Sequence, residues 1–281
     1  MPEDYREDAA VRRQLDLCNA LTVPDKIIDI DLTPDIKTYI RLSGADLTGI
    51  ADLEPFKNGW VVVPEDILNP YAYAVSIAKK LDDGIINTII DGPTPEYAGH
   101  YRDINATLDT ISAQTAVWIT EKGYKARAIP ASHIADDDNL LGNISHKAVA
   151  RMAGIGWQGK SLLIISPEYG PRIRLATILT DMPLSADEPI RNRCGRCMEC
   201  VKACPASAIK NISTDSRYET REDAIYLNRC FNKVSEFKAR PGIGALICGV
   251  CVKVCPFGKK KSSQKRVAAA RGLKDKDALI P

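Results

Sequence analysis

This sequence has no long apolar run, little histidine and almost no excess of charge of either sign. Its longest apolar run, IGALICGVCV at 243–252, is far shorter than the roughly 20 residues that span a bilayer. The first twenty residues carry acids and bases throughout, so they lack the apolar segment of a secretory signal. A net charge of +2 is too small to indicate nucleic acid or an anionic membrane as the partner. We therefore expect a cytoplasmic protein that does not bind membranes.

The small net charge hides an uneven distribution. Eight Lys or Arg and two Asp lie between Gly258 and Pro281. A basic tail of this kind is usually a solvated chain end, although it could also dock an acidic partner or a phosphate backbone. The whole chain is 45% apolar and 26% charged, which is typical of a soluble globular protein.

Cysteine, by contrast, is concentrated in one part of the chain. Eight of the nine cysteines fall within the 62 residues from 194 to 255. Thiols stay reduced in a cytoplasmic protein, so a dense group of them indicates metal binding rather than disulfides. The ninth, Cys18, stands far from the others, and we interpret it as a buried apolar residue.

The cysteine spacing predicts two iron–sulfur clusters. CGRCMECVKACP at 194–205 has the spacing C-x2-C-x2-C-x3-C-P, in which three thiolates bind one [4Fe–4S] cluster and the fourth binds a second. CGVCVKVCP at 248–256 is a shortened copy, and Cys230 supplies the missing ligand. Zinc, the alternative for paired C-x2-C motifs, does not account for two runs that end in Cys-Pro. The crossed arrangement predicts Cys194, Cys197, Cys200 and Cys255 for cluster one, and Cys204, Cys230, Cys248 and Cys251 for cluster two.

Hydrophobic periodicity predicts mixed structure in the rest of the chain. We expect helices at 7–21 and 104–124 and short strands at 60–64, 74–78 and 125–131. This alternation predicts an α/β (α+β) domain over residues 1–188. A ferredoxin-like double-cluster domain over 189–258 and a basic tail over 259–281 would follow it.

The stretch GIGWQGKS at 154–161 matches two nucleotide-binding patterns, G-x-G-x-x-G and G-x-x-x-x-G-K-[ST]. Both patterns need a strand before the glycines and a helix after them. Here the preceding ISHKAVARMAG has helical spacing, and the following LLIIS is typical of a strand. The predicted helix–loop–strand order offers a phosphate group no helix N-terminus, so we do not expect a nucleotide here.

Residues 153–184, followed by CGRCMECVKACPASAI, resemble the core of the epoxyqueuosine reductase family, which is similar to the reductive dehalogenases. Cys230 lies between the two cysteine runs as in that family, and a weaker similarity covers residues 40–130. The resemblance implies an α/β domain that holds a cobalamin against a ferredoxin-like domain with two [4Fe–4S] clusters. It therefore implies an iron–sulfur oxidoreductase.

The resemblance also implies which residues hold the cobalamin. Glycines of the 154–161 loop would let the backbone approach the corrin closely, Trp157 would pack near the corrin or a cluster, and Lys160 would meet a polar corrin side chain. No histidine lies in an Asp-x-His-x-x-Gly pattern, so we expect cobalamin base-off or without a protein histidine ligand. The implied cofactor residues are Tyr97, His146, Gly154, Gly156, Trp157, Gly159, Lys160 and Ser161.

The chain departs from the family at its proton donor and at its end. Leu140 occupies the position of the family's acidic residue, with Asp138 close by, and the family's tyrosine segment survives only as YAGHYRD at 97–103. Tyr101, His100 and Asp138 are therefore the candidate proton donors. The chain ends 26 residues after Cys255, without the helical repeats that hold tRNA in queuosine-forming members.

Three functions are compatible with these observations. The first is a reductase that takes electrons from an external low-potential donor and reduces a small substrate at cobalamin. The second is an electron-transfer or reductive-activation partner of a separate corrinoid protein. The third, which the missing repeats make less favoured, is a genuine tRNA epoxyqueuosine reductase. The sequence names neither the substrate nor the electron donor.

Overall fold

A four-stranded antiparallel sheet is the centre of the computed structural model, which describes residues 31–57 and 59–259. The predicted helix at 7–21, Cys18 and the tail from residue 260 lie outside the described residues. The strands are β1 (Leu47–Asp52), β2 (Tyr73–Lys80), β3 (Ala126–Ile129), β4 (Trp157–Gln158), β5 (Ile164–Ile165) and β6 (Ile173–Thr180). The helices are α2 (Thr33–Leu42), α3 (Glu54–Lys57), α4 (Asp83–Thr88), α5 (Pro95–Glu121), α6 (His146–Met152), α7 (Glu199–Ala203), α8 (Arg221–Ala224), α9 (Leu227–Lys238) and α10 (Val250–Val254).

The strand order in the main sheet is β1-β2-β6-β3, and every neighbouring pair is antiparallel. The two long central strands, β2 and β6, pair along their whole length, from Tyr73 opposite Thr180 to Lys80 opposite Ile173. The mixed helix and strand fold predicted from the sequence is confirmed. The antiparallel pairing places it on the α+β side of that prediction.

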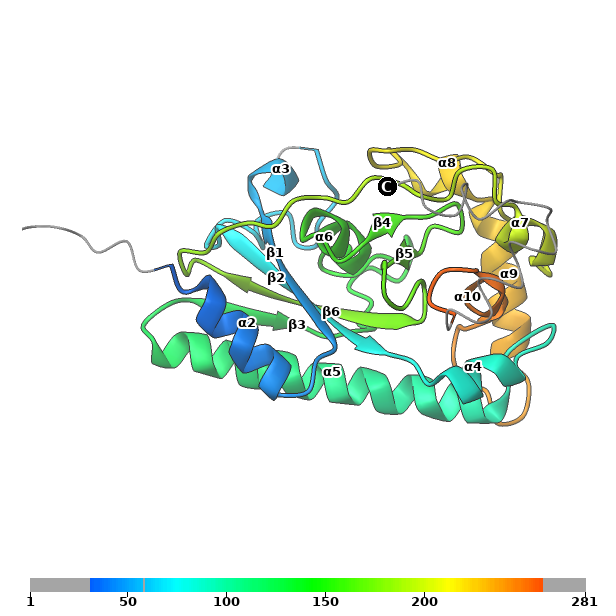
Figure 1. Ribbon diagram of the computed structural model, residues 1–281, viewed down its shortest axis with the longest axis horizontal. Helices are drawn as coiled ribbons and strands as arrows, with labels where there is room; N and C mark the ends of the chain where they lie inside the picture. The colour runs from blue at the N-terminus through cyan, green and yellow to red at the C-terminus, as the bar shows by residue number, and fades with distance from the viewer. Residues whose placement is uncertain (1–30, 58, 260–281) are drawn as a thin grey trace, which may run out of the picture. The chain divides into compact units, whose positions relative to one another are not determined.

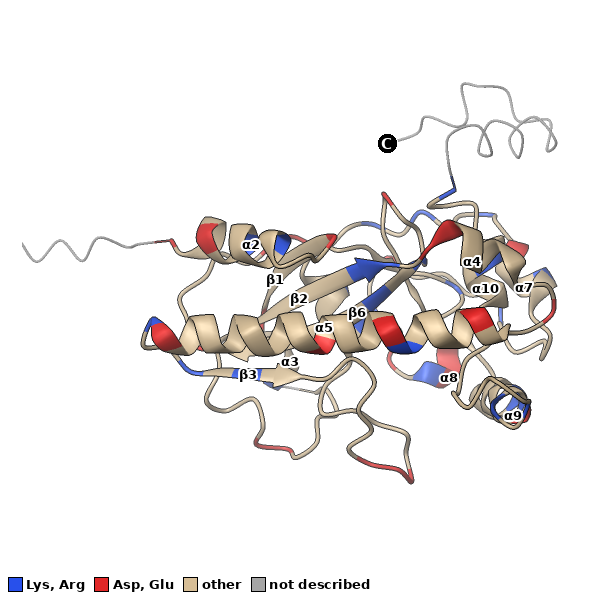
Figure 2. Ribbon diagram, turned by 90° about the horizontal axis from the view of Figure 1, so that it is seen from below, with Lys and Arg blue, Asp and Glu red and all other residues tan. Residues whose placement is uncertain are grey.

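Helices cover both faces of this sheet (Figure 1). The long helix α5 crosses one face beside α2 (Figure 2), and α6 packs on the opposite face (Figure 1). Side chains alternate accordingly along β2, because successive residues of a strand point to opposite faces. Val75 and Ile77 join the core beneath α2 and α5, and Ala74 and Ala78 join the core beneath α6.

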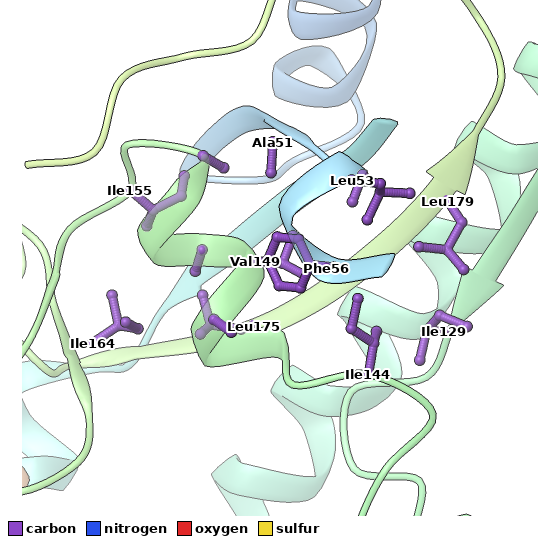
Figure 3. Close-up of a cluster of buried hydrophobic side chains, with 14 of the residues drawn as sticks. Ala51, Leu53, Phe56, Ile129, Ile144, Val149, Ile155, Ile164, Leu175 and Leu179 are labelled. Carbon is purple, nitrogen blue, oxygen red and sulfur yellow. The ribbon is translucent and has the colours of Figure 1, made fainter. Parts of the chain in front are cut away.

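The core on the α6 side is built from residues far apart in the sequence (Figure 3). Phe56 and Val149, from α3 and α6, lie against Leu175 and Leu179 of β6. All four are at least nine-tenths buried. This packing fixes the C-terminal end of α6 over the sheet, and the glycine loop begins there.

The predicted helix at 104–124 is confirmed but begins nine residues earlier, at Pro95 of α5. Thr94 is the N-cap, and its hydroxyl accepts a hydrogen bond from the Tyr97 backbone N–H at 3.2 Å. Pro95 follows at the first helical position, where its missing N–H costs nothing. The extension places Tyr97, His100 and Tyr101 on α5 rather than in a loop.

Two of the three predicted short strands form, and one does not. Residues 74–78 lie within β2, and 125–131 contains β3. The prediction of a strand at 60–64 is wrong, because these residues form no strand in the structure. Val63 instead exchanges hydrogen bonds with Asn143, at 3.0 Å and 2.7 Å. Val61 is 70% exposed.

The helices of the cysteine segment, α7 to α10, gather at the end of the sheet where α4 lies and α5 begins (Figure 1). Ile243, Ile247 and Val250 share one apolar cluster with Ile86 and Tyr97. The glycine stretch follows α6 and leads into the hairpin of β4 and β5, so the predicted helix–loop–strand order is confirmed. Within the described residues, no helix is both long and apolar enough to cross a membrane.

Candidate metal centre

Five cysteines from two distant parts of the chain line one cavity. Its empty space, counted to its open mouth, is about 380 Å³. Gly159, Lys160 and Ser161 of the glycine loop face the same space. In the part of the chain that the structure describes, no three His, Cys, Asp or Glu side chains are grouped to hold one metal ion. The lining cysteines are Cys194, Cys197, Cys200, Cys251 and Cys255.

The cysteines influence one another in two sets. The pKa of Cys200 is raised to about 11 and that of Cys255 to about 12, mainly by burial and next by neighbouring thiols that include Cys194 and Cys197. These are the four cysteines predicted for cluster one.

The other set lies around α9 and α10. Burial raises the pKa of Cys230, Cys248 and Cys251. The charge of Cys204 raises each of these pKa values further, and those of Cys248 and Cys251 are also raised by the charges of neighbouring cysteines in this set. These four are the cysteines predicted for cluster two. Cys251 is also affected by Cys200, so it lies between the sets.

Lys160 lies between the glycine loop and the first cysteine run. It is 5% exposed, and its Nζ donates hydrogen bonds to Gly195 O at 2.8 Å, Cys197 O at 3.0 Å and Asn211 Oδ1 at 2.9 Å. These partners belong to the cysteine run and the segment after it. A lysine with three protein acceptors has no N–H left for a corrin side chain.

The three glycines of the loop make close contacts within the protein. A Cβ on Gly156 would lie 2.3 Å from Ile165 O, and one on Gly154 would lie 2.8 Å from Glu188 O. A Cβ on Gly159 would lie 2.8 Å from the Ile165 side chain and 3.4 Å from Cys194 Sγ. The chain itself therefore occupies the space that the missing side chains leave.

Trp157 lies in β4 and is 1% exposed. Its ring meets Phe257 edge-on with centroids 4.8 Å apart, and Phe257 lines the cysteine cavity. Its indole Nε1 is buried without a hydrogen-bond partner. Trp157 thus connects the glycine loop to the segment that follows Cys255.

Tyr97 and His146, both implied as cofactor residues, are held by protein contacts. Burial raises the pKa of Tyr97 to about 12, and the ring packs against Gly249, next to Cys248. His146 Nε2 faces Pro130 O at 3.0 Å, and Nδ1 faces Thr177 Oγ1 at 2.8 Å. Because a carbonyl only accepts, Nε2 carries the proton and Nδ1 accepts from the threonine. Both nitrogens of His146 are therefore engaged.

The three candidate proton donors are not gathered at one point. His100 Nε2 accepts a hydrogen bond from the Asp82 backbone N–H at 2.9 Å. Asp138 is exposed, in a turn closed by the bridge between Asp136 and Leu141. Tyr101 alone belongs to a polar cluster on the sheet.

This polar cluster surrounds the guanidinium of Arg174 on β6. Arg174 donates to Tyr101 Oη at 3.3 Å, to Ser132 Oγ at 2.9 Å and to Asn105 Oδ1 at 3.0 Å. Its Cζ also lies 4.4 Å from the centre of the Tyr101 ring. Burial raises the pKa of Tyr101, but Arg174 and the hydrogen bonds outweigh it, so the net shift is downward.

Lys147 on α6 is a candidate that sequence reasoning missed. Burial, and next the charges of Arg221 and Arg174, lower the pKa of Lys147 to about 8. Arg174 was missed as well. Both lie next to features that the sequence did single out: Lys147 follows His146, and Arg174 lies in the strand after the glycine loop. The sequence could not single out Lys147 or Arg174 as site residues, because their surroundings depend on how β6 pairs and where α6 packs.

The match to a known domain family defines the class of protein. Residues 193–258 match the model of the 4Fe-4S double cluster binding domain, so this chain is an iron–sulfur protein with a site for two clusters. The match spans all eight cysteines of the two predicted sets.

Curated relatives make the resemblance specific. The chain is 34% identical to the epoxyqueuosine reductase of Bacillus subtilis (strain 168), over 43% of this chain and 31% of that protein. It is 27% identical to the tetrachloroethene reductive dehalogenase of Sulfurospirillum multivorans, over 84% of this chain and 52% of that protein. The chain thus spans about a third to a half of the length of these relatives. The resemblance to both groups, predicted from the sequence, is confirmed.

Solved structures show the same fold. The catabolic reductive dehalogenase NpRdhA superposes with a TM-score of 0.68 at 22% identity, over 89% of this chain and 36% of that one. An epoxyqueuosine reductase in complex with a modified tRNA stem loop superposes with a TM-score of 0.52 at 22% identity, over 81% of this chain and 65% of that one.

Proposed function

We propose that this chain is an iron–sulfur reductase that passes electrons through two [4Fe–4S] clusters to a bound cobalamin and so reduces a small substrate. The observation that carries the proposal is the double-cluster domain at residues 193–258, five of whose cysteines line a cavity against the glycine loop. The reductase relatives supply the reaction class.

The thiol groups fit two clusters. Cluster one would be held by Cys194, Cys197, Cys200 and Cys255, and cluster two by Cys204, Cys230, Cys248 and Cys251. These sets are supported by the pKa shifts, because the cysteines that influence each raised pKa are mainly other members of the same set. The clusters would supply one-electron steps at low potential.

The cobalamin is supported by structural likeness and not by the glycine loop. One neighbour, at a TM-score of 0.66 and 22% identity, is a reductive dehalogenase whose structure suggests a mechanism for B12-dependent dehalogenation. In this chain the space at Gly154, Gly156 and Gly159 is filled by protein, and Lys160 is fully bonded. The contacts that these residues make are therefore contacts within the protein, and we assign no step of the reaction through them.

Proton delivery is the chemistry that this chain's own side chains can perform. Tyr101 has a lowered pKa and shares Arg174 with Ser132 and Asn105, so a phenolate formed there would be stabilised. Lys147, with a pKa of about 8, is also matched to proton transfer near neutral pH. We assign proton donation to Tyr101 and keep Lys147 as the second candidate. The exposed Asp138 and the bonded His100 are weaker ones.

Anaerobic reconstitution tests the cofactors. Protein refilled with iron and sulfide would bind two clusters, counted by iron analysis and electron paramagnetic resonance. Titration with cobalamin, followed by ultraviolet–visible spectra, would show a bound corrinoid without a histidine ligand. A protein that holds no cluster would refute the whole proposal. One that holds clusters but no corrinoid would refute the cobalamin and favour an electron-transfer role.

A second candidate is a tRNA epoxyqueuosine reductase, because several curated relatives of that name are 34–35% identical over 118–128 residues. Two probes separate the candidates: an epoxyqueuosine-modified tRNA stem loop and 3-bromo-4-hydroxybenzoic acid, which are found with the two groups of structural neighbours. Loss of the epoxide from the stem loop would favour the tRNA activity, and bromide release would favour a dehalogenase.

The proton donor is tested with whichever of the two probes the protein converts. Tyr101→Phe removes the hydroxyl that Arg174 contacts and should lower turnover about 100-fold or more, as the loss of general acid catalysis does. Tyr39→Phe, which removes an exposed hydroxyl bonded to Gln114 O on α5, is the matched control and should be silent. Equal activity of the two variants at full iron content would exclude Tyr101.

A further inference from the structure

Lys160 is buried, and its Nζ makes three hydrogen bonds, as many as an ammonium group has N–H donors. It donates to three oxygens, and a neutral amine has only two N–H groups. All three acceptors are uncharged: two backbone carbonyls and the amide oxygen of Asn211. A full positive charge is therefore held at a side chain that is 5% exposed.

Holding such a charge away from water is unfavourable unless a negative charge lies close to it. Thiolates bound to a cluster in the cavity that Lys160 faces would supply that charge, because Cys194, Cys197, Cys200 and Cys255 line the same space. A set of thiolates around a cluster would be the counter-charge that the lysine otherwise lacks.

The same side chain also holds the cluster loop in shape. Gly195 has a left-handed φ of +46°, and its carbonyl is one of the acceptors of Lys160. The Cys197 N–H donates to Cys194 O at 3.0 Å and closes the turn, while Cys197 O accepts from Lys160. Lys160 thus reaches the first C-x2-C turn from the glycine loop, 35 and 37 residues away in the chain.

We propose that Lys160 is a positioning residue for cluster one that also raises its reduction potential relative to cluster two. Each electron that enters a cluster makes it more negative, and a fixed cation close by favours that state. The low exposure of the site reduces screening by water and salt. This inference rests on the proposed cluster ligands. It gives the stretch GIGWQGKS, through Lys160, a role in electron transfer.

Two variants separate the electrostatic effect from the structural one. Lys160→Met removes the charge and all three hydrogen bonds but keeps an unbranched stem. Asn211→Asp keeps Lys160 and its contacts but adds a carboxylate at the acceptor that lies 2.9 Å from Nζ. Lys202→Met is the matched control, because Lys202 is an exposed lysine on α7, between Cys200 and Cys204.

The measurement is an anaerobic redox titration of the reconstituted full-length protein, with the two clusters followed separately by electron paramagnetic resonance. We expect one cluster midpoint to become more negative in Lys160→Met and in Asn211→Asp, while the other midpoint stays within error of the parent. Lys202→Met should shift neither midpoint measurably, because solvent screens its charge.

Iron content distinguishes the possible failures. If the parent protein binds no clusters, the proposed function fails first. If Lys160→Met loses one cluster, the positioning role is supported and Asn211→Asp decides the electrostatic role. Unchanged midpoints in Asn211→Asp, or a shift no larger than in Lys202→Met, would overturn the effect on potential. Full iron and unchanged midpoints in Lys160→Met would overturn both roles.

Discussion

Single residues of the glycine loop show how sequence pattern and structure differ. Gly154, Gly156 and Gly159 match two phosphate-binding patterns and, by resemblance, a cofactor cradle. In the structure, packing within the chain requires glycine at two of these positions. Gly154 has a φ of +66°, and Gly156 lies against the β5 backbone, where a Cβ would not fit. A pattern of glycines indicates that something approaches the backbone, and only coordinates show what it is.

Replacing Gly156 with alanine tests this packing. A Cβ would lie 2.3 Å from Ile165 O, so β4 or β5 would have to shift. We expect Gly156→Ala to lower the free energy of unfolding by about 3 kcal/mol. The control is Gly99→Ala on α5, where a Cβ meets nothing within 4 Å. That variant should raise stability by up to about 1 kcal/mol, because alanine is the better helix former. Chemical denaturation of both variants measures the difference, and equal effects would contradict the packing.

His146 predicts a pH dependence of stability. Burial, together with Arg174, lowers its pKa to about 4, against the opposing effects of Pro130 O and Asp109. The unfolded chain binds the proton below its usual pKa of about 6.5, and the folded chain does not, so stability is lost as the pH falls from about 6.5 towards 4. Between about pH 7.5 and pH 5.5 the loss should be about 1 kcal/mol larger for the parent than for His146→Gln. Denaturation curves at both pH values test this, and parallel losses would show that His146 does not titrate in this way.

At the scale of helices, α5 begins with a side-chain cap and a proline at its first position. Thr94 accepts a hydrogen bond from Tyr97 N–H, so Thr94→Ala should cost about 1 kcal/mol of stability. Thr110 is the control on the same helix, since it is exposed and its hydroxyl only bonds back to Ala106 O. Thr110→Ala should be neutral or slightly stabilising. Thermal unfolding of the two variants checks the cap, and a Thr94→Ala variant as stable as Thr110→Ala would contradict it.

How far the elements could be predicted depends on their packing. The periodicity of residues 104–124 found α5, because one face of that helix lies on the sheet. The apolar letters at 60–64 suggested a strand as strongly as those at 74–78, but only the latter have β1 and β6 as neighbours. The prediction of the cysteine ligands rests on their spacing, since a cluster sets the distances between its thiols. The polar cluster around Arg174 brings together side chains of α5, β6 and residue 132, which are far apart in the sequence. A local sequence pattern cannot predict such a contact.

At the scale of the whole molecule, the cysteine segment is attached to the sheet by close contacts. A Cβ on Gly258 would lie 2.0 Å from Tyr169 O, and one on Gly170 would lie 2.1 Å from Phe257 O. Arg172, 1% exposed, donates to Lys253 O at 3.1 Å, and Arg102 donates to Ile243 O at the same distance. The final cysteine run is therefore part of the same packed unit as α5 and β6. Electrons that reach Cys255 would arrive directly beside the glycine loop.

The segment between the two cysteine runs lacks comparable support. Around residues 189–240 the buried apolar cluster is small, built from Leu162, Tyr218, Ala224 and Ile225, and α7 and α8 have only five and four residues. A segment with so small a core depends on its metal for folding. Removal of iron by chelation should therefore expose the arginines and lysines between 191 and 240 to trypsin, while residues 32–185 and 243–259 stay protected. Peptide mapping of apo and reconstituted protein tests this. Cleavage spread evenly over the sheet, or an apo protein as resistant as the reconstituted one, would show that the clusters do not hold this segment in place.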